Sequence, residues 1–127
     1  MTQTARYHHG DLHATLLQEA NTLLNEQGIE GLSLRKLAER AGVSRTAPYH
    51  HFRDKNALLC ALATQAFSQL DEMINRQLQA TGSQEGIQNF VREYLRFATE
   101  NPEQYELMFG RTIWKGGEPT DELKTIA

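Results

Sequence analysis

The residues of this chain best suited to chemistry with a polyanion lie in one short stretch, residues 33–55. This stretch contains six Lys or Arg and two Asp or Glu side chains, a local charge of +4, although the whole chain has a net charge of -3. Near its middle stand Arg45, Thr46, Tyr49 and His50. Such groups donate hydrogen bonds to phosphate oxygens and to base edges in the major groove of DNA. The stretch therefore indicates a contact with nucleic acid.

Two short helices joined by a tight turn are expected to position these side chains. Ser33 is a favourable N-cap for the first helix, and Gly42 is a favourable residue to end it. The second helix is predicted over residues 45–52, with Ser44 as its cap. A small residue where the helices cross, here Ala38, and a glycine in the turn match the helix-turn-helix plan.

A second interpretation of the same pattern is a helical hairpin that serves packing or binds another protein, because Ala and Gly at this spacing are common in helices. The chain would then be a helical protein-interaction module that does not read DNA. The local positive charge favours the DNA-binding hypothesis.

The rest of the sequence also predicts helices. Apolar residues recur at steps of three and four positions, and strand-like alternation does not persist. The expected helices cover residues 11–27, 33–41, 45–52, 54–80 and 87–99, with further helices starting near 102 and 120. The sequence therefore predicts an all-α protein.

Catalytic, metal-dependent and membrane functions are not expected. The sequence has no phosphate-binding loop, zinc-protease or nucleophile-elbow motif, which predicts that the chain is not an enzyme and uses no cofactor. His9 and His13 are spaced to chelate a divalent cation and His8 is nearby, but only Asp11 could add a ligand, so no metal site is predicted. No run approaches the roughly 18 apolar residues that cross a bilayer, and no signal peptide is visible, so a cytoplasmic protein without a membrane partner is expected.

Four stretches of the sequence resemble the DNA-binding domain of the TetR (tetracycline repressor) family of bacterial transcriptional regulators. They are YHHGDL at 7–12, GIEGLSLRKLA at 28–38, AGVSRTAPYHHF at 41–52 and KNALL at 55–59. The resemblance implies a DNA-binding domain over residues 7–70, with the helix-turn-helix at 33–52 and a long fourth helix leading onward. It also implies a homodimer that binds a palindromic operator in double-stranded DNA, most often as a repressor.

The same resemblance implies DNA-contacting roles for particular residues. Phosphate contacts are implied for Ser33, Arg35, Tyr49, His51 and Lys55. Contacts with base edges are implied for Arg45, Thr46 and Ala47. Independently of the resemblance, the charges of His50 and His51 are expected to tune DNA affinity, because histidine titrates near neutral pH. Pro48 stands where the family more often has Leu or Ile. We expect it in the first turn of its helix, where a missing N–H costs little.

The remaining residues, 71–127, are implied to begin a helical domain for effector binding and dimerisation that the chain does not complete. Candidates for lining a pocket for a small-molecule effector are Tyr94, Phe97, Tyr105, Phe109 and Trp114. Core packing is the alternative role of these residues, because helix packing needs aromatic side chains at such spacings. The sequence WKGG at 114–117 is similar to the subgroup with a Trp-rich, WHG-type ligand domain.

Overall fold

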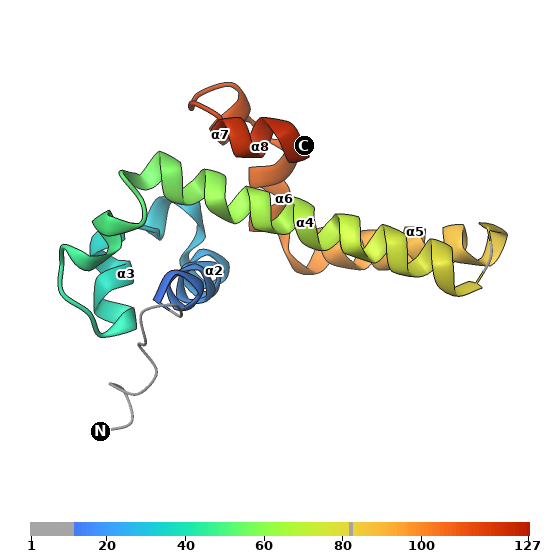
Figure 1. The fold of residues 1–127 in the computed structure, drawn as a ribbon, viewed down its shortest axis with the longest axis horizontal. Helices are drawn as coiled ribbons and strands as arrows, with labels where there is room; N and C mark the ends of the chain where they lie inside the picture. Colours follow the sequence, from blue (N-terminus) through green and yellow to red (C-terminus); the bar gives the residue numbers. More distant parts are fainter. Residues whose placement is uncertain (1–11, 82) are drawn as a thin grey trace. The chain divides into compact units, whose positions relative to one another are not determined.

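The computed structural model describes residues 12–127 except Gly82, and every regular element in this part of the chain is a helix. The elements in chain order are α2 (Leu12–Gly31), α3 (Leu34–Ala41), the 3₁₀ helix η1 (Ala47–His50), α4 (Lys55–Thr81), α5 (Ser83–Glu100), α6 (Pro102–Phe109), α7 (Arg111–Trp114) and α8 (Asp121–Ile126) (Figure 1). The predicted all-α class is confirmed. None of the described helices is long and apolar enough to cross a bilayer.

The chain divides into two compact units at the junction of Leu62 and Ala63. The N-terminal unit contains α2, α3, η1 and the first part of α4, and the C-terminal unit contains the rest of α4 with α5 to α8. The N-terminal unit buries the apolar faces predicted for its first two helices, namely Leu16, Ala20, Leu23 and Leu24 on α2 and Leu34, Leu37, Ala38 and Ala41 on α3. Buried apolar residues of the C-terminal unit include Ala66, Leu107, Met108, Ile113 and Leu123. Each unit therefore has a core of its own.

A glycine interrupts α2 one turn before its end. Gly28 has φ 78° and ψ 177°, a backbone conformation that is essentially restricted to glycine. The chain then makes a short turn in which the N–H of Leu32 donates to the carbonyl oxygen of Ile29 at 3.3 Å. The sequence predicts a helix end at Gly28; the structure interrupts the helix there, but helical backbone resumes and α2 continues to Gly31.

Replacing Gly28 with alanine is expected to lower the free energy of unfolding by about 1–3 kcal/mol, because a Cβ atom makes this backbone conformation unfavourable. Gly42 offers a matched control, since its φ of 72° and ψ of 31° lie in the left-handed helical region, which asparagine also adopts. Gly42→Asn should therefore be tolerated, whereas Gly28→Asn should destabilise like Gly28→Ala. Urea unfolding followed by circular dichroism measures the difference. Equal effects of asparagine at both positions would contradict this account of Gly28.

Both ends of α3 are fixed by local hydrogen bonds. At its start the Oγ of Ser33 accepts a hydrogen bond from the N–H of Lys36 at 3.1 Å. At its end Gly42 adopts the left-handed conformation, and the N–H of Val43 donates to the carbonyl oxygen of Ala38 at 3.1 Å. The predicted caps of this helix are confirmed.

The next helix is shorter than predicted and of another type. The sequence predicts an α-helix over residues 45–52, whereas the structure has the 3₁₀ helix η1 over four residues. An α-helix capped by Ser44 would need the N–H of residue 48 for its first hydrogen bond, and Pro48 has no N–H. The N–H of Ala47 donates to the carbonyl oxygen of Ser44 instead, at 3.1 Å, which is the 3₁₀ pattern. Pro48 therefore changes the type of helix that presents the candidate DNA contacts.

The later helices follow the predicted order with some different ends. The Oδ1 of Asp54 accepts a hydrogen bond from the N–H of Ala57 at 2.9 Å, so Asp54 caps α4 as predicted. The helix α5 begins at Ser83, four residues before the predicted start. Apolar periodicity could not indicate these four residues, because the first turn is polar. The short helix α7 is not among the predicted elements.

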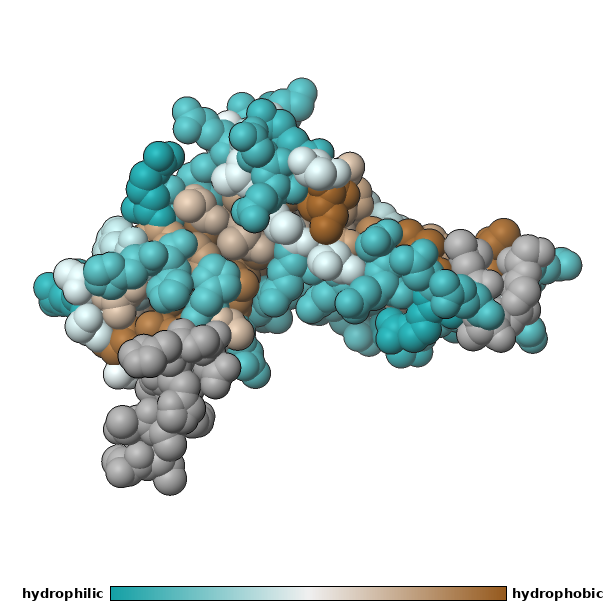
Figure 2. Space-filling model, in the orientation of Figure 1, coloured by the Kyte–Doolittle hydropathy of each residue, from teal (hydrophilic) through white to brown (hydrophobic). Residues whose placement is uncertain are grey.

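Apolar residues reach the surface along α5 of the C-terminal unit (Figure 2). Ile87, Val91 and Leu95 are 53%, 47% and 56% exposed. Because they are spaced by four positions, they form one stripe on the helix. The described residues leave this stripe uncovered.

Candidate nucleic-acid interface

The start of α3 carries two of the predicted phosphate contacts, Ser33 and Arg35. The Oγ of Ser33 accepts the capping hydrogen bond from the N–H of Lys36, and its O–H can still donate to a phosphate. Arg35 is exposed in the first turn. The N–H groups and the dipole at a helix start favour an anion, so at this end of α3 the accessible side-chain charge comes from Arg35.

Two other cations of the basic stretch are bound to α2. The Nη1 of Arg40 lies 2.8 Å from the Oε1 of Glu26, and its Nε lies 3.9 Å from the Oε1 of Glu19. The hydrogen bond and the guanidinium charge lower the pKa of Glu26, and Glu26 raises the pKa of Arg40. The Nζ of Lys36 donates to the Oε1 of Gln27 at 3.0 Å. The local charge of +4 therefore overstates the charge available to a ligand.

Residues 44–52 form what we term the reading segment, which begins as a hydrogen-bonded turn and continues as η1. Arg45 and Thr46 are exposed in the turn, and Tyr49 and His50 are exposed on η1. Tyr49 is 54% exposed although it is a large aromatic residue. The segment thus brings four hydrogen-bonding side chains to the surface within one short stretch.

Buried residues hold the reading segment in place. Phe52 is 3% exposed and Pro48 is buried, and the N–H of Phe52 donates to the carbonyl oxygen of Pro48 at 2.9 Å. Ala47, a predicted contact with bases, is half-buried at the first position of η1. Its role in base contact stays a prediction.

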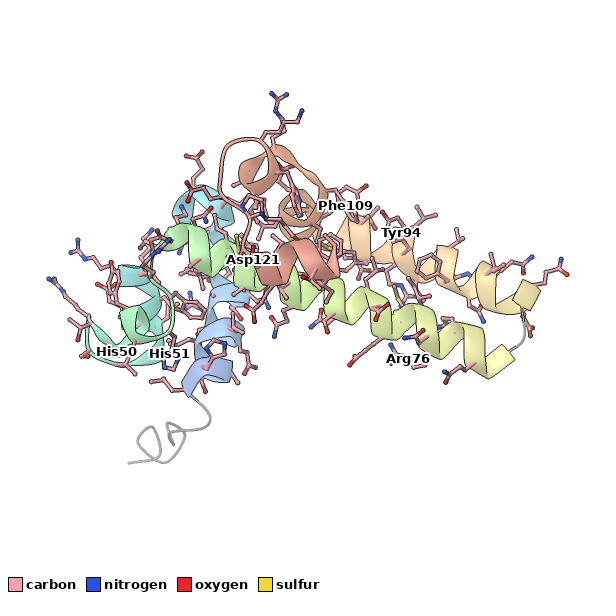
Figure 3. All side chains as sticks on the ribbon, turned by 45° about the horizontal axis from the view of Figure 1, so that its top comes forward. His50, His51, Arg76, Tyr94, Phe109 and Asp121 are labelled. Carbon is pink, nitrogen blue, oxygen red and sulfur yellow. The ribbon has the colours of Figure 1, made fainter. Side chains whose placement is uncertain are left out.

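His51 lies beside His13 of α2. The two Nδ1 atoms are 3.4 Å apart and the ring centroids are 5.3 Å apart. Burial, and to a lesser degree the charges of His13 and His50, lower the pKa of His51. His50 is its exposed neighbour in the reading segment (Figure 3). The lowered pKa favours the uncharged form of His51 at neutral pH, and in that form its predicted phosphate contact would use a neutral N–H donor.

Lys55, at the start of α4, is tied to the end of α2. Its Nζ donates to the carbonyl oxygen of Ile29 at 2.7 Å, and the contact is partly buried. An ammonium group has three donors, so this bond leaves two for a phosphate. The structure therefore gives Lys55 a packing role in addition to the phosphate contact that the resemblance implies.

Three of the predicted pocket residues, Tyr94, Tyr105 and Phe109, form a row of ring contacts in the C-terminal unit. Tyr105 lies 6.3 Å from Tyr94 and 5.1 Å from Phe109 between ring centroids, and Figure 3 marks Tyr94 and Phe109. A hydrogen bond with Tyr105 is the main cause that raises the pKa of Tyr94. The Nε1 of Trp114 donates to the carbonyl oxygen of Met108 at 2.8 Å. Tyr105 and Phe109 are 37% and 47% exposed, so a role of these residues in lining a pocket stays a prediction.

A groove of about 280 Å³ lies within the C-terminal unit, between α4 and α5. Its lining consists of Ala66, Gln69, Leu70, Met73, Arg76, Glu93, Arg96, Phe97, Glu100 and Asn101. Phe97 is the one predicted pocket residue in this lining. Sequence reasoning missed Arg76 and Arg96 because it considered aromatic residues only.

No three His, Cys, Asp or Glu side chains among the described residues lie close enough together to hold a metal ion. A metal site at the N-terminal histidines would also need His8, His9 and Asp11. These residues lie outside the described part of the chain. His13 contacts His51 instead, and sequence reasoning missed this contact. The two histidines are 38 positions apart, so no spacing within one helix could indicate their contact.

The chain is similar in sequence to known regulatory proteins. Residues 16–62 match the family model described as bacterial regulatory proteins, tetR family. The tetracycline repressor protein class A from transposon 1721 of Escherichia coli is 59% identical over 49 residues, which cover 39% of this chain and 23% of that protein. The HTH-type transcriptional repressor AcnR of Corynebacterium glutamicum is 33% identical over 73% of this chain and 43% of its own length.

The similarity extends to a solved structure, that of the TetR family transcriptional regulator PfmR from Thermus thermophilus. It matches with a TM-score of 0.65 and 31% identity, over 87% of this chain and 60% of that chain. The matched part of this chain thus spans less than half the length of the two repressors and about three fifths of PfmR. The family model covers α3, the reading segment and the start of α4, which hold the candidate interface. Residues 16–62 of this chain therefore belong to the TetR family of bacterial regulatory proteins.

Proposed function

We propose that this chain is a DNA-binding transcriptional regulator that represses by occupying a palindromic operator as a homodimer in the bacterial cytoplasm. One observation carries the proposal: Arg45, Thr46 and Tyr49 are exposed on a segment that buried Pro48 and Phe52 anchor. Donor groups on a rigid support suit phosphates and base edges. The names of the two repressors among its relatives support the direction of regulation.

The proposal assigns residues 7–70 to DNA binding and residues 71–127 to effector binding and dimerisation. The groove between α4 and α5 supports a site for a small-molecule effector, and its arginines and glutamates favour a polar or charged one; its lining begins at Ala66, just before the proposed boundary. The uncovered apolar stripe on α5 supports a contact with further protein surface. Membership of the WHG-type subgroup stays a prediction.

Fluorescence anisotropy tests the proposal. The purified chain is titrated into a labelled duplex from the region upstream of its own gene, and into a scrambled duplex of the same composition. Arg35 and Lys55 of two protomers would neutralise about four phosphates, so the association constant should fall about a hundredfold between about 50 and 200 mM salt. The upstream duplex should bind more tightly than the scrambled duplex at both salt concentrations.

Equal affinity for both duplexes would remove the sequence-reading part of the proposal. Absence of binding at low salt would favour the other interpretation of the sequence, a helical module that contacts protein. A mixture of the chain with each duplex, examined by analytical ultracentrifugation, reports whether two copies bind together.

A further inference from the structure

Three aromatic rings from two elements meet at the end of the reading segment. His13 of α2 lies 5.3 Å from His51 and 5.2 Å from Phe52, and His51 lies 6.3 Å from Phe52, between ring centroids. Phe52 is buried in the core of the N-terminal unit. His13 therefore packs on a fixed ring and at the same time meets His51.

The distance of 3.4 Å between the Nδ1 atoms of His13 and His51 fits one hydrogen bond, in which one ring donates and the other accepts. The partner of one ring nitrogen fixes which form of the imidazole is present and how the ring is oriented. Because Nδ1 of His51 is engaged by His13, Nε2 is the ring nitrogen that remains for a ligand. A neutral imidazole donates from one nitrogen only, so an Nε2 donor requires that Nδ1 of His51 accepts.

We propose that His13 is a positioning residue for DNA binding, because it holds the His51 ring so that its Nε2–H donates to a backbone phosphate. The inference rests on the proposed function and extends the interface to α2, outside the helix-turn-helix. It assigns a role to His13 that neither the sequence motifs nor the family model, which begins at residue 16, contains.

The same contact sets the pH dependence of binding. Among the described residues, the titratable groups that act on His51 are His13 from α2 and His50 from the reading segment, and no carboxylate contributes. Burial and these two neighbours oppose a charge on His51 in the unbound chain, whereas a phosphate favours that charge. DNA binding should therefore take up a proton at low pH, with Nδ1 of the charged His51 then donating to Nδ1 of His13, and affinity should rise as the pH falls toward the lowered pKa of His51. In a variant without His13, the rise in DNA affinity should begin at a higher pH, because His13 no longer opposes a positive charge on His51.

A double-mutant cycle on DNA affinity tests the proposal in the full chain. His13→Ala should weaken binding about fivefold, the loss of one hydrogen bond, but less than twofold when His51 is already alanine. His13→Asn should retain the affinity, because its side-chain amide can replace Nδ1. Gln18→Ala, an exposed polar residue on the same helix, serves as the control and should have no effect. An equal loss from His13→Ala in both backgrounds would show a purely structural role and overturn the proposal.

Nuclear magnetic resonance of the imidazole nitrogens separates this inference from the proposed function. In the unbound chain at pH 7.5, the shifts should show His51 protonated on Nε2, and His13→Ala should raise the pKa of His51. Protonation on Nδ1 of His51 would overturn the inference even if the chain binds DNA. If the chain binds no DNA while the shifts are as expected, the proposed function fails and the positioning role falls with it.

Discussion

Replacing Leu37 with alanine is expected to lower the free energy of unfolding of the N-terminal unit by about 2–5 kcal/mol. Leu37 has no exposed surface and lies in the middle of α3, beside Ala38, which is 1% exposed. Truncation at such a site removes the buried side chain and leaves a cavity in its place. Domains of this size are stable by about 5–15 kcal/mol, so the loss is a large share of the total. Hydrogen exchange of the α3 amides reports the change in this unit alone.

The matched control for Leu37→Ala is Arg35→Ala, two positions earlier on the same helix. Arg35 is exposed, and its replacement should change the free energy of unfolding by less than about 0.5 kcal/mol. Its effect should appear in DNA affinity instead, because it removes charge at the start of α3. If the α3 amides of both variants exchange alike, the packing described for α3 is wrong.

The ends of the early helices could be predicted from the sequence because their causes are local. A serine hydroxyl caps the helix within three residues, as Ser33 does, and a glycine adopts a positive φ through its own lack of a Cβ, as Gly28 and Gly42 do. The buried faces of the first two helices could also be predicted from the sequence, because a period of 3.6 residues places apolar positions on one face. These features need no knowledge of distant residues.

The reading segment shows that the tolerance of proline in a first helical turn depends on its position within that turn. The sequence pattern around Pro48 indicates a helix, and a proline is tolerated in the first turn of an α-helix. Counted from a cap at Ser44, however, Pro48 occupies the position that must donate the first hydrogen bond, so the segment forms a 3₁₀ helix. The residue types of the candidate interface could be predicted. The type of helix that presents them could not, because it depends on the place of Pro48 relative to the cap at Ser44.

The contacts that tie the interface to α2 could not be predicted from spacing. His51 meets His13 across 38 positions, and Lys55 meets Ile29 across 26. Arg40 pairs with Glu26 across 14 positions, which removes a cation that composition alone counts as available. Such pairs depend on how the helices pack, and no periodicity within one helix encodes them.

Replacing Arg45 with alanine should reduce the preference for the operator over a scrambled duplex about ten- to a hundredfold, the contribution of one good base contact. Replacing Lys55 with alanine should weaken both duplexes by the same factor and reduce the salt dependence, because a phosphate contact carries no sequence information. Arg53→Ala serves as the control, since 85% of the Arg53 side chain is exposed and its Nε lies 3.9 Å from Asp54. Its effect measures the loss of one positive charge from the same region. Anisotropy titrations at two salt concentrations give all of these ratios.

Lys55 needs a second measurement, because its ammonium group also holds the carbonyl oxygen of Ile29. That carbonyl follows the interruption at Gly28, so Lys55→Ala should loosen the end of α2 as well as remove a phosphate contact. A thermal melt separates the two effects: a lower Tm with unchanged affinity at low temperature would leave Lys55 with packing alone. Arg45 is exposed in the turn that precedes η1, so Arg45→Ala should leave Tm unchanged. If both variants lower the affinity for the two duplexes by equal factors, Arg45 does not read bases, and the reading segment binds DNA through charge only.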